Sequence, residues 1–324
     1  MATTAQAVYL DCDTGIDDAI ALAFLLAVAE VDLVGVGTVS GNTSAQQAAR
    51  NTLDLLAVAG RFDVPVAVGE HDWLTRAYDG GSPHVHGENG IGDLEIPRSP
   101  QVPLEDTAAE LLIRLSHDHA GSLDVVAIGP LTNLARALEI DPALAGRIRQ
   151  VTVMGGAASA AGNVTAVAEA NIWHDPEAAQ SVVSASWPVL LVPLDLTMEH
   201  VFDEHHQEQL LSSADPLARQ VGRMLDRYLD FYVDVYGRRC SALHDPLAAA
   251  IAVGQVALTR APAVPMEVDV TFGPSRGQTV VDLRRQRRGP VDHQGVTTRV
   301  ALAIEADNIA PHLIEVLTSR RFRR

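Results

Sequence analysis

Four aspartates stand close together near the amino-terminus, and their spacing is the strongest chemical signal in the 324-residue chain. They are Asp11, Asp13, Asp17 and Asp18. The segment lies between two apolar runs, so it predicts a buried strand, a tight turn at Gly15 and a helix that begins near Asp17. Because side chains alternate along a strand, Asp11 and Asp13 should leave it on the same side.

So many carboxylates around one turn need a compensating positive charge. Two like charges in contact repel by roughly 1 kcal/mol in water and by about 4 kcal/mol at an effective dielectric of 20. The helix dipole returns only roughly 0.3–1 kcal/mol per charge. The first basic residue of the chain is Arg50, so the turn brings no cation of its own. A hard divalent cation with oxygen ligands, Ca²⁺ or Mg²⁺, is the simplest remedy. A solvated acidic turn is the alternative, and the preceding apolar strand disfavours it.

The elements that position these carboxylates alternate between strand and helix. This pattern predicts an α/β fold with a mostly parallel central sheet, right-handed crossovers and flanking helices, of the Rossmann-like kind. The expected strands are 7–10, 33–39, 64–68, 123–128, 151–154 and 189–192, and the expected helices are 17–30, 44–59, 105–120, one that ends near 140, and 176–186.

Polar residues follow most of these strands at the point where each strand ends. They are Asp11 and Asp13, Asn42, Thr132, the loop from Met154 to Asn171, and Asp195. Ligands of parallel α/β proteins bind at the carboxyl ends of the strands. The sequence therefore predicts one acidic, oxygen-rich pocket at that edge of the sheet.

Residues 199–254 change character and are mostly helical in pattern. An amphipathic helix is expected over 216–236, and His244 with Asp245 opens another helix. We expect this part to be a small helical cap that completes the active site of a single domain, 1–324.

Two further regions lie outside the regular alternation of strands and helices. The long Gly- and Pro-rich segment 69–103 is expected to be a lid that carries His86, with a mobile surface loop as the alternative. Near the end of the chain the sequence predicts β-like runs at 266–271, 278–283 and 297–304, and a helix at 307–319.

The composition of the chain limits the kinds of molecule that the protein is expected to bind. The net charge of −17 makes nucleic acid an unfavourable partner. Two cysteines provide no disulfide framework. No signal peptide and no apolar run long enough to span a membrane is recognised, so a cytoplasmic protein with no membrane partner is expected. The Arg-rich stretches 284–288 and 320–324 are expected to be solvated surface or subunit contacts.

Residues 11–19, Asp-Cys-Asp-Thr-Gly-Ile-Asp-Asp-Ala, resemble the D-x-D-P-G-x-D-D-A signature of the nucleoside hydrolases, the inosine/uridine-preferring nucleoside N-ribohydrolase family. Thr14 stands where that family usually has Pro, so the turn is less pre-organised, although no ligating oxygen is lost. Further segments match in the same order: Gly41-Asn42, Gly129-Pro130-Leu131-Thr132-Asn133, Met154-Gly155-Gly156 through Asn163, Glu169 and Asn171, His244-Asp245-Pro246, and the stretch from Gly277 to Asp282.

The resemblance implies calcium-dependent hydrolysis of the N-glycosidic bond of a ribonucleoside. The implied Ca²⁺ ligands are the carboxylates of Asp13, Asp18 and Asp245 and the main-chain oxygen of Thr132. Asp13 would be the general base that takes a proton from the attacking water, and Asp11 would lie behind the ligands and brace them. The implied ribose contacts are Asp17, Asn42, Met154, Asn163, Glu169 and Asn171.

Four residues are candidates for the end of the pocket that holds the base. His244, beside the ligand Asp245, is the leading candidate for the acid that assists the leaving base, and His86 is second. Tyr228 and Tyr232 lie one helical turn apart shortly before His244 and would line the base pocket, unless they only pack the amphipathic helix. The resemblance also implies a homodimer or homotetramer that serves nucleoside catabolism and purine or pyrimidine salvage.

Two rival functions can be weighed on the same residues. A phosphatase of the haloacid-dehalogenase type also opens with strand-D-x-D, but it needs Thr or Val where this chain has Gly15, and a phosphate-binding Lys where this chain has no Lys at all. A non-catalytic nucleoside or ribose binder on the same fold would typically have lost the base or a metal ligand. Asp13, Asp18 and Asp245 are all present, which favours the enzyme.

Overall fold

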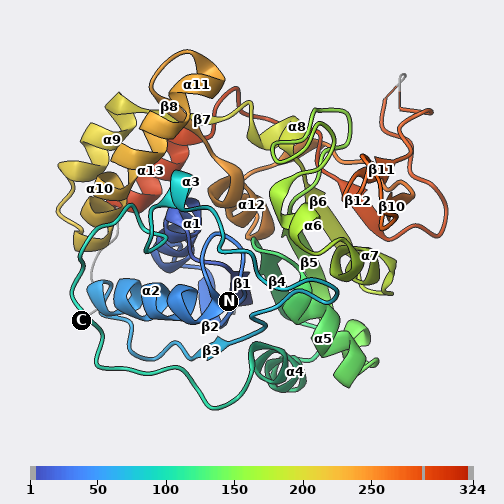
Figure 1. The fold of residues 1–324 in the computed structure, drawn as a ribbon, viewed down its shortest axis with the longest axis horizontal. Coiled ribbons are helices and arrows are strands. Elements are labelled where there is room, and N and C mark those ends of the chain that lie inside the picture. The colour runs from blue at the N-terminus through green and yellow to red at the C-terminus, as the bar shows by residue number, and fades with distance from the viewer. Residues whose placement is uncertain (1–4, 287–288, 320–324) are drawn as a thin grey trace.

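The computed structural model describes residues 5–286 and 289–319, and its centre is a seven-stranded sheet (Figure 1). The strand order is β12-β6-β5-β4-β1-β2-β3, and every neighbouring pair is parallel. The strands are β1 (Gln6–Cys12), β2 (Val31–Thr38), β3 (Val66–Val68), β4 (Leu123–Ala127), β5 (Ile148–Met154), β6 (Val189–Val192) and β12 (Thr298–Val300). The predicted α/β fold with a parallel central sheet is confirmed.

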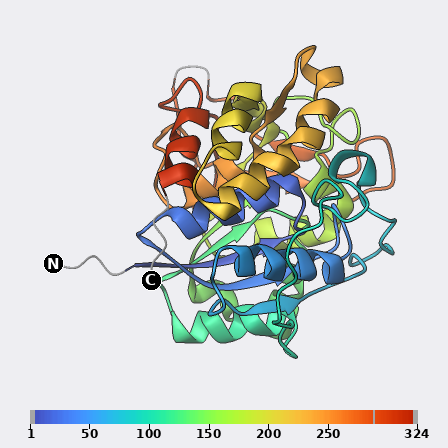
Figure 2. The same ribbon diagram turned by 90° about the vertical axis from the view of Figure 1, so that its left-hand side faces the viewer.

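Helices cover both faces of this sheet, because the strands are apolar on both sides. Along β1, Val8 and Leu10 belong to one buried core and Tyr9 to the other, as period-2 alternation requires. Figure 2 shows helices stacked on one side of the sheet and α4 on the other. The first core includes α1 (Ile16–Ala27), α2 (Ala45–Val58), α12 (His244–Ala252) and α13 (Ala310–Ser319), and the second includes α4 (Ala108–Asp118), α5 (Thr132–Ile140) and α7 (Pro176–Ser184).

The mostly helical part at 199–254, which includes α12, packs beside α1 and α13 (Figure 1). It contains α9 (Glu204–Leu211), α10 (Pro216–Phe231) and α11 (Val233–Tyr236), and a short antiparallel pair of β7 (Val201–Asp203) with β8 (Cys240–Ala242). The single helix expected over 216–236 is wrong in one respect, because the helix breaks at Tyr232. None of the described helices is long and apolar enough to cross a lipid bilayer.

The carboxy-terminal part supplies an edge of the sheet. The run expected at 297–304 divides into β12, which pairs with β6, and β13 (Ala303–Ile304), which pairs with β9 (Leu258–Arg260). The other two runs become the antiparallel hairpin of β10 (Met266–Val268) and β11 (Thr279–Val281). Residues 287–288 and 320–324 of the Arg-rich stretches lie outside the described residues.

The long segment 69–103 has one regular element, the short helix α3 (Pro83–His86). It is anchored on α10 through Arg227, whose Nη2 donates to the main-chain oxygen of Pro83 at 2.7 Å. Nη1 of the same Arg lies 3.1 Å from Oδ2 of Asp93. The segment is therefore fastened on both sides of His86.

Candidate active site

The acidic turn is folded around its own carboxylates. Between the end of β1 and the start of α1, Asp18 accepts hydrogen bonds from the main-chain N–H of Gly15 at 2.8 Å and of Asp13 at 3.1 Å. Asp13 in turn accepts from the main-chain N–H of Asn42 at 2.6 Å. All of these carboxylates are buried. The loop after β2, which carries Asn42, thus holds the loop after β1 in place.

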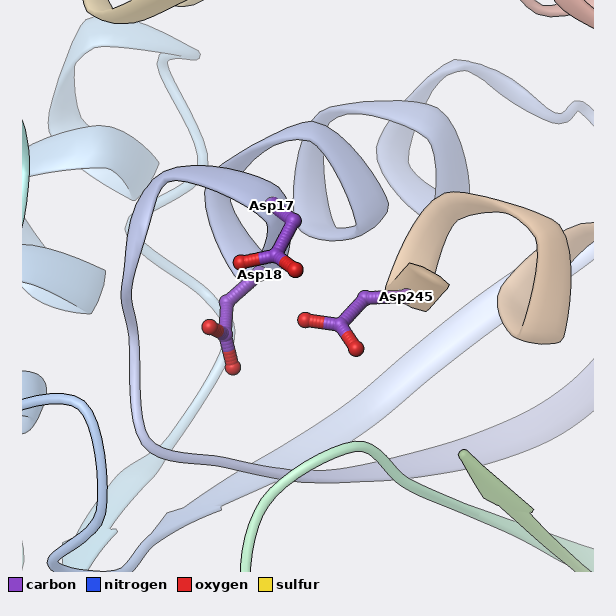
Figure 3. A group of neighbouring side chains, drawn as sticks. All are labelled: Asp17, Asp18 and Asp245. Carbon is purple, nitrogen blue, oxygen red and sulfur yellow. The ribbon is translucent and has the colours of Figure 1, made fainter. Parts of the chain in front are cut away.

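Asp245, at the start of α12, meets this turn although it lies far away in sequence. Carboxylate oxygens of Asp17, Asp18 and Asp245 lie within 4.8 Å of one another. Figure 3 shows these three side chains facing one another between the first turns of α1 and α12. Asp13 is a neighbour of this group, hydrogen-bonded to Asp18 through its main chain.

The electrostatics of the group call for a cation. Burial, and then the charge of Asp17, raises the pKa of Asp18 to about 7. Burial and the charge of Asp18 raise the pKa of Asp13 well above its usual range, and burial with the charge of Asp17 does the same for Asp245. Oδ1 of Asp17 is buried without a hydrogen-bond partner among the described residues. The described residues pair this group with no Arg or Lys, and the nearest base is the His86 ring, 4.0 Å from Oδ1 of Asp17. Carboxylate ligands and an orphaned acceptor oxygen fit a hard divalent cation.

A cavity of about 790 Å³ opens next to the acidic group. Its wall contains Asp245, His244 and every residue expected to contact substrate: Asp17, Asn42, His86, Met154, Asn163, Glu169, Asn171, Tyr228 and Tyr232. These residues come from the start of α1, from the loops after β2 and β3, from the end of β5 and the segment that follows it, and from α10, Tyr232 directly after it, and α12. Asp13 and Asp18 lie behind this wall. No Lys or Arg lines the cavity among the described residues, and its acidic side chains are Asp17, Asp79, Glu169 and Asp245.

One end of the cavity is held by main-chain hydrogen bonds. Glu169 accepts from the N–H groups of Gly156 and Asn171, both at 2.9 Å, yet burial still raises its pKa to about 7. Asn171 donates to the main-chain oxygens of Ile128 at 2.9 Å and Met154 at 3.1 Å. The ends of β4 and β5 therefore fix the polar groups at this end.

The other end is aromatic and carries both candidate histidines. Nε2 of His244 lies 2.7 Å from the hydroxyl of Tyr232, and the hydroxyl of Tyr228 donates to Oδ2 of Asp17 at 2.8 Å. Nδ1 of His86 accepts the main-chain N–H of Ile16 at 3.1 Å. Burial lowers the pKa of His244, and it lowers the pKa of His86 to about 4, so burial favours the neutral form of each ring.

Two of the expected residues brace the site from behind. The carboxylate of Asp11 accepts hydrogen bonds from the Tyr9 hydroxyl at 3.2 Å and from Asn133 Nδ2 at 3.0 Å. The side chain of Thr132 donates to Asp175 at 2.8 Å. The role of the Thr132 main-chain oxygen as a ligand stays a prediction.

The pattern of polar residues after strands predicted Asp195 in the pocket, where the structure does not place it, and gave no sign of two aromatic residues that line the cavity. Asp195 does not line the cavity; its carboxylate accepts the main-chain N–H groups of Ala158, Ser159 and Ala160 and so holds the loop that leads to Asn163. Trp173 and Phe231 line the cavity, although their sequence positions carried no signal beyond being close to Asn171 and Tyr232.

The close approach of Gly41 to the Asp13 carboxylate leads to a simple test of how precisely that carboxylate must be placed. A Cβ at position 41 would overlap Oδ2 of Asp13 and come within 2.8 Å of Pro130. We expect Gly41→Ala to displace the carboxylate and to lower kcat about a hundredfold, the scale of a 1 Å misplacement. Gly146→Ala is the matched control, because a Cβ there has no atom within 4 Å. Equal kcat values for the two variants would show that Asp13 tolerates the displacement.

The fold and the site together define an α/β protein with a polar cavity beside buried carboxylates that could hold a cation. The sequence profile described as inosine-uridine preferring nucleoside hydrolase matches residues 8–310. The chain is 34% identical over 320 residues to a protein of Arabidopsis thaliana named probable uridine nucleosidase 2, and this match covers 97% of this chain and 96% of that protein. It is also 34% identical over 319 residues to the inosine-uridine preferring nucleoside hydrolase of Leishmania major, covering 96% of each.

A solved structure agrees with these sequence relatives. The purine-preferring ribonucleoside hydrolase from Gardnerella vaginalis matches with a TM-score of 0.86 and 32% identity, over 97% of this chain and 98% of that one. The chain belongs to the nucleoside hydrolase family, and it is an enzyme that acts on the N-glycosyl bond of ribonucleosides.

Proposed function

We propose that this enzyme hydrolyses ribonucleosides to ribose and free base with Ca²⁺ held by Asp13, Asp18, Asp245 and the main-chain oxygen of Thr132. The observation that supports this most is the meeting of buried Asp17, Asp18 and Asp245 oxygens, for which the described residues provide no Lys or Arg partner and only the His86 ring, 4.0 Å from Asp17. Asp17 is assigned to the ribose: Tyr228 already donates to its Oδ2, and its Oδ1, which has no hydrogen-bond partner among the described residues, is left to accept from a ribose hydroxyl. When bound, calcium supplies a positive charge that holds ribose hydroxyls and makes a water more acidic.

The residues of this chain then divide the work of the reaction. The oxygen of a water attacks C1′ as the bond from C1′ to the base nitrogen breaks, and Asp13 takes the proton that the water loses. The buried carboxylates of the site stabilise positive charge on the ribosyl group as that charge develops. His244 and the neighbouring Tyr232 hydroxyl assist the base by placing a proton near the nitrogen that leaves. Glu169, Asn163 and Asn171 orient the ribose.

The direct test of this proposal is chemical. Purified protein is mixed with CaCl₂ and a panel of inosine, uridine, cytidine and adenosine, and the release of reducing sugar is measured. Turnover that is lost with a calcium chelator and restored by Ca²⁺ supports the proposal. Nucleoside binding without release of sugar would instead support a binding protein. The same panel decides the base preference, for which the relatives' names point to both uridine and purines.

The sugar makes a sharper prediction. If the 2′-hydroxyl contacts the cation and its carboxylates, 2′-deoxyuridine loses those contacts, and kcat/KM should fall at least about a hundredfold, or about 2.7 kcal/mol in barrier height. The measurement compares uridine with 2′-deoxyuridine in CaCl₂. Equal kcat/KM values for the two nucleosides would show that the 2′-hydroxyl does not contact the cation.

The assembly and setting of the enzyme are part of the proposal. We propose a single domain over 1–324 that forms a homodimer or homotetramer and acts in the cytoplasm, in nucleoside catabolism and salvage. Sedimentation of the purified protein measures the assembly, and a monomer at micromolar concentration would contradict it.

A further inference from the structure

Thr197 is a buried residue that touches the site without lining the cavity. It is the last residue of α8 (Leu194–Thr197), the short helix that follows β6. Its Oγ1 lies 2.8 Å from Nδ1 of His244. Since Nε2 of the same ring lies 2.7 Å from the Tyr232 hydroxyl, His244 is held by a hydroxyl at each nitrogen.

The backbone that carries Thr197 is firmly placed. Its main-chain N–H donates to the oxygen of Pro193 at 3.1 Å, directly after β6. The neighbouring Asp195 accepts main-chain N–H groups of the loop after β5, at 2.7 Å from both Ala158 and Ser159. The hydroxyl of Thr197 is thus presented to His244 from the sheet itself.

The direction of these hydrogen bonds follows from counting protons. A buried hydroxyl donor needs an acceptor, and the neutral imidazole ring has one nitrogen that accepts. The Nδ1 atom of His244 is the partner that the described residues provide for Oγ1 of Thr197. If Nδ1 carried the proton, it would donate to Thr197, and the threonine's own proton would have no acceptor there. Thr197 therefore donates to Nδ1, and the ring proton is on Nε2.

We propose that Thr197 is a positioning residue that fixes the proton of His244 on Nε2, the nitrogen that faces Tyr232 and the cavity. This inference rests on the proposed function for its consequence: Nε2–H donates to the Tyr232 oxygen, and the proton passes to the base that leaves through the Tyr232 hydroxyl, which lines the cavity. Thr197 touches neither substrate nor cation, so it acts through His244 alone.

The first measurement needs no variant. Protein labelled with ¹⁵N at histidine gives ring-nitrogen shifts that tell a protonated Nε2 from a protonated Nδ1 at pH 8, and the signal lost in His244→Asn assigns the residue. The Nε2–H tautomer is expected. A dominant Nδ1–H tautomer in the wild-type protein would overturn the proposal, whether or not any nucleoside is hydrolysed.

Variants then separate positioning from packing. Thr197→Val keeps the shape and removes the hydroxyl, and Thr197→Ser keeps the hydroxyl. We expect Val to mix the two tautomers and to lower kcat on inosine about tenfold to a hundredfold, the cost of losing an orienting partner, with KM changed less than about threefold. Ser should restore a single tautomer and kcat to within about threefold of the wild type.

The matched control is Thr152→Val, a buried threonine of β5 outside the cavity wall. It should leave the His244 signals and kcat unchanged. If Val and Ser at position 197 lose kcat equally, or if Val retains both tautomer and kcat, the proposal is wrong. If wild-type protein hydrolyses no nucleoside, the proposed function fails, and the ¹⁵N spectra still decide the hydrogen bond.

Discussion

Asp13→Asn lowers kcat on uridine and inosine about a thousandfold, within the range of about 10² to 10⁴ that a positioned general base contributes. The amide keeps the shape of the side chain, and its oxygen can still accept the main-chain N–H of Asn42, now 2.6 Å from the carboxylate. What the variant loses is the ability to take a proton and one negative charge beside Asp18. The loss should therefore fall on kcat more than on KM.

A buried carboxylate elsewhere separates this effect from general damage. Asp124 lies at the opposite, amino end of the sheet, where its carboxylate is 2.8 Å from Nε of Arg149. Asp124→Asn also removes a buried charge, and we expect it to leave kcat within about twofold of the wild type although stability falls. An Asp13→Asn enzyme with near-wild-type kcat would exclude Asp13 as the base.

The carboxyl-edge site could be predicted because it follows from the order of strands. Once 7–10 and 33–39 are assigned as parallel strands, Asp13 and Asn42 must end at the same edge, and the hydrogen bond between them agrees. The repulsion among the aspartates was also visible in the sequence, because Arg50 is the first basic residue. Local pattern and elementary electrostatics were enough for both.

Contacts between distant segments could not be predicted in this way. Nothing in the spacing brings Asp245 to Asp17; that came from the family resemblance, and in the structure it results from the packing of α12 against α1. The break of the helix at Tyr232 was missed, because the amphipathic period continues through it. The partner of His244 was missed as well, since a lone Thr197 after a strand carries no chemical signal of its own.

Polar residues at strand ends also serve two purposes that a sequence cannot distinguish. Asp195 and Asp13 both follow apolar strands, yet Asp195 accepts main-chain hydrogen bonds and organises a loop, whereas Asp13 lies against other carboxylates. The difference is the number of N–H donors that face each side chain, which only the tertiary structure sets.

Without metal, the enzyme should lose stability as the pH rises from 5.5 to 8. Burial raises the pKa of Asp18, Asp11 and Glu169 to about 7 each, and it also raises those of Asp13 and Asp245. A group with a raised folded-state pKa stabilises the fold fully below its unfolded pKa, and that stability is lost as the pH rises through the folded value. In the pH range where the folded state still holds the proton and the unfolded state has lost it, each such group lowers the free energy of unfolding by about 1.4 kcal/mol per pH unit.

Calcium should reverse this loss, because it neutralises charges that protons no longer cover. At a hundredfold excess over its Kd, a ligand that binds only the folded state adds about 2.7 kcal/mol, so the Tm at pH 8 should rise by about 5 °C or more. At pH 5.5 protons compete for the same oxygens, and the gain should be smaller. Thermal unfolding in a chelator and in CaCl₂, at both pH values, measures all four cases.

Asp245→Asn provides the decisive comparison for this cation site. Removing one buried charge should raise the Tm of the metal-free protein at pH 8, because the remaining carboxylates repel one another less, and it should abolish most of the gain from Ca²⁺. Asp124→Asn, remote from the cavity, should keep the full calcium response. A metal-free Tm that does not fall between pH 5.5 and pH 8, or a calcium response that survives in Asp245→Asn, would mean that the buried aspartates are stabilised by something other than a cation held among them.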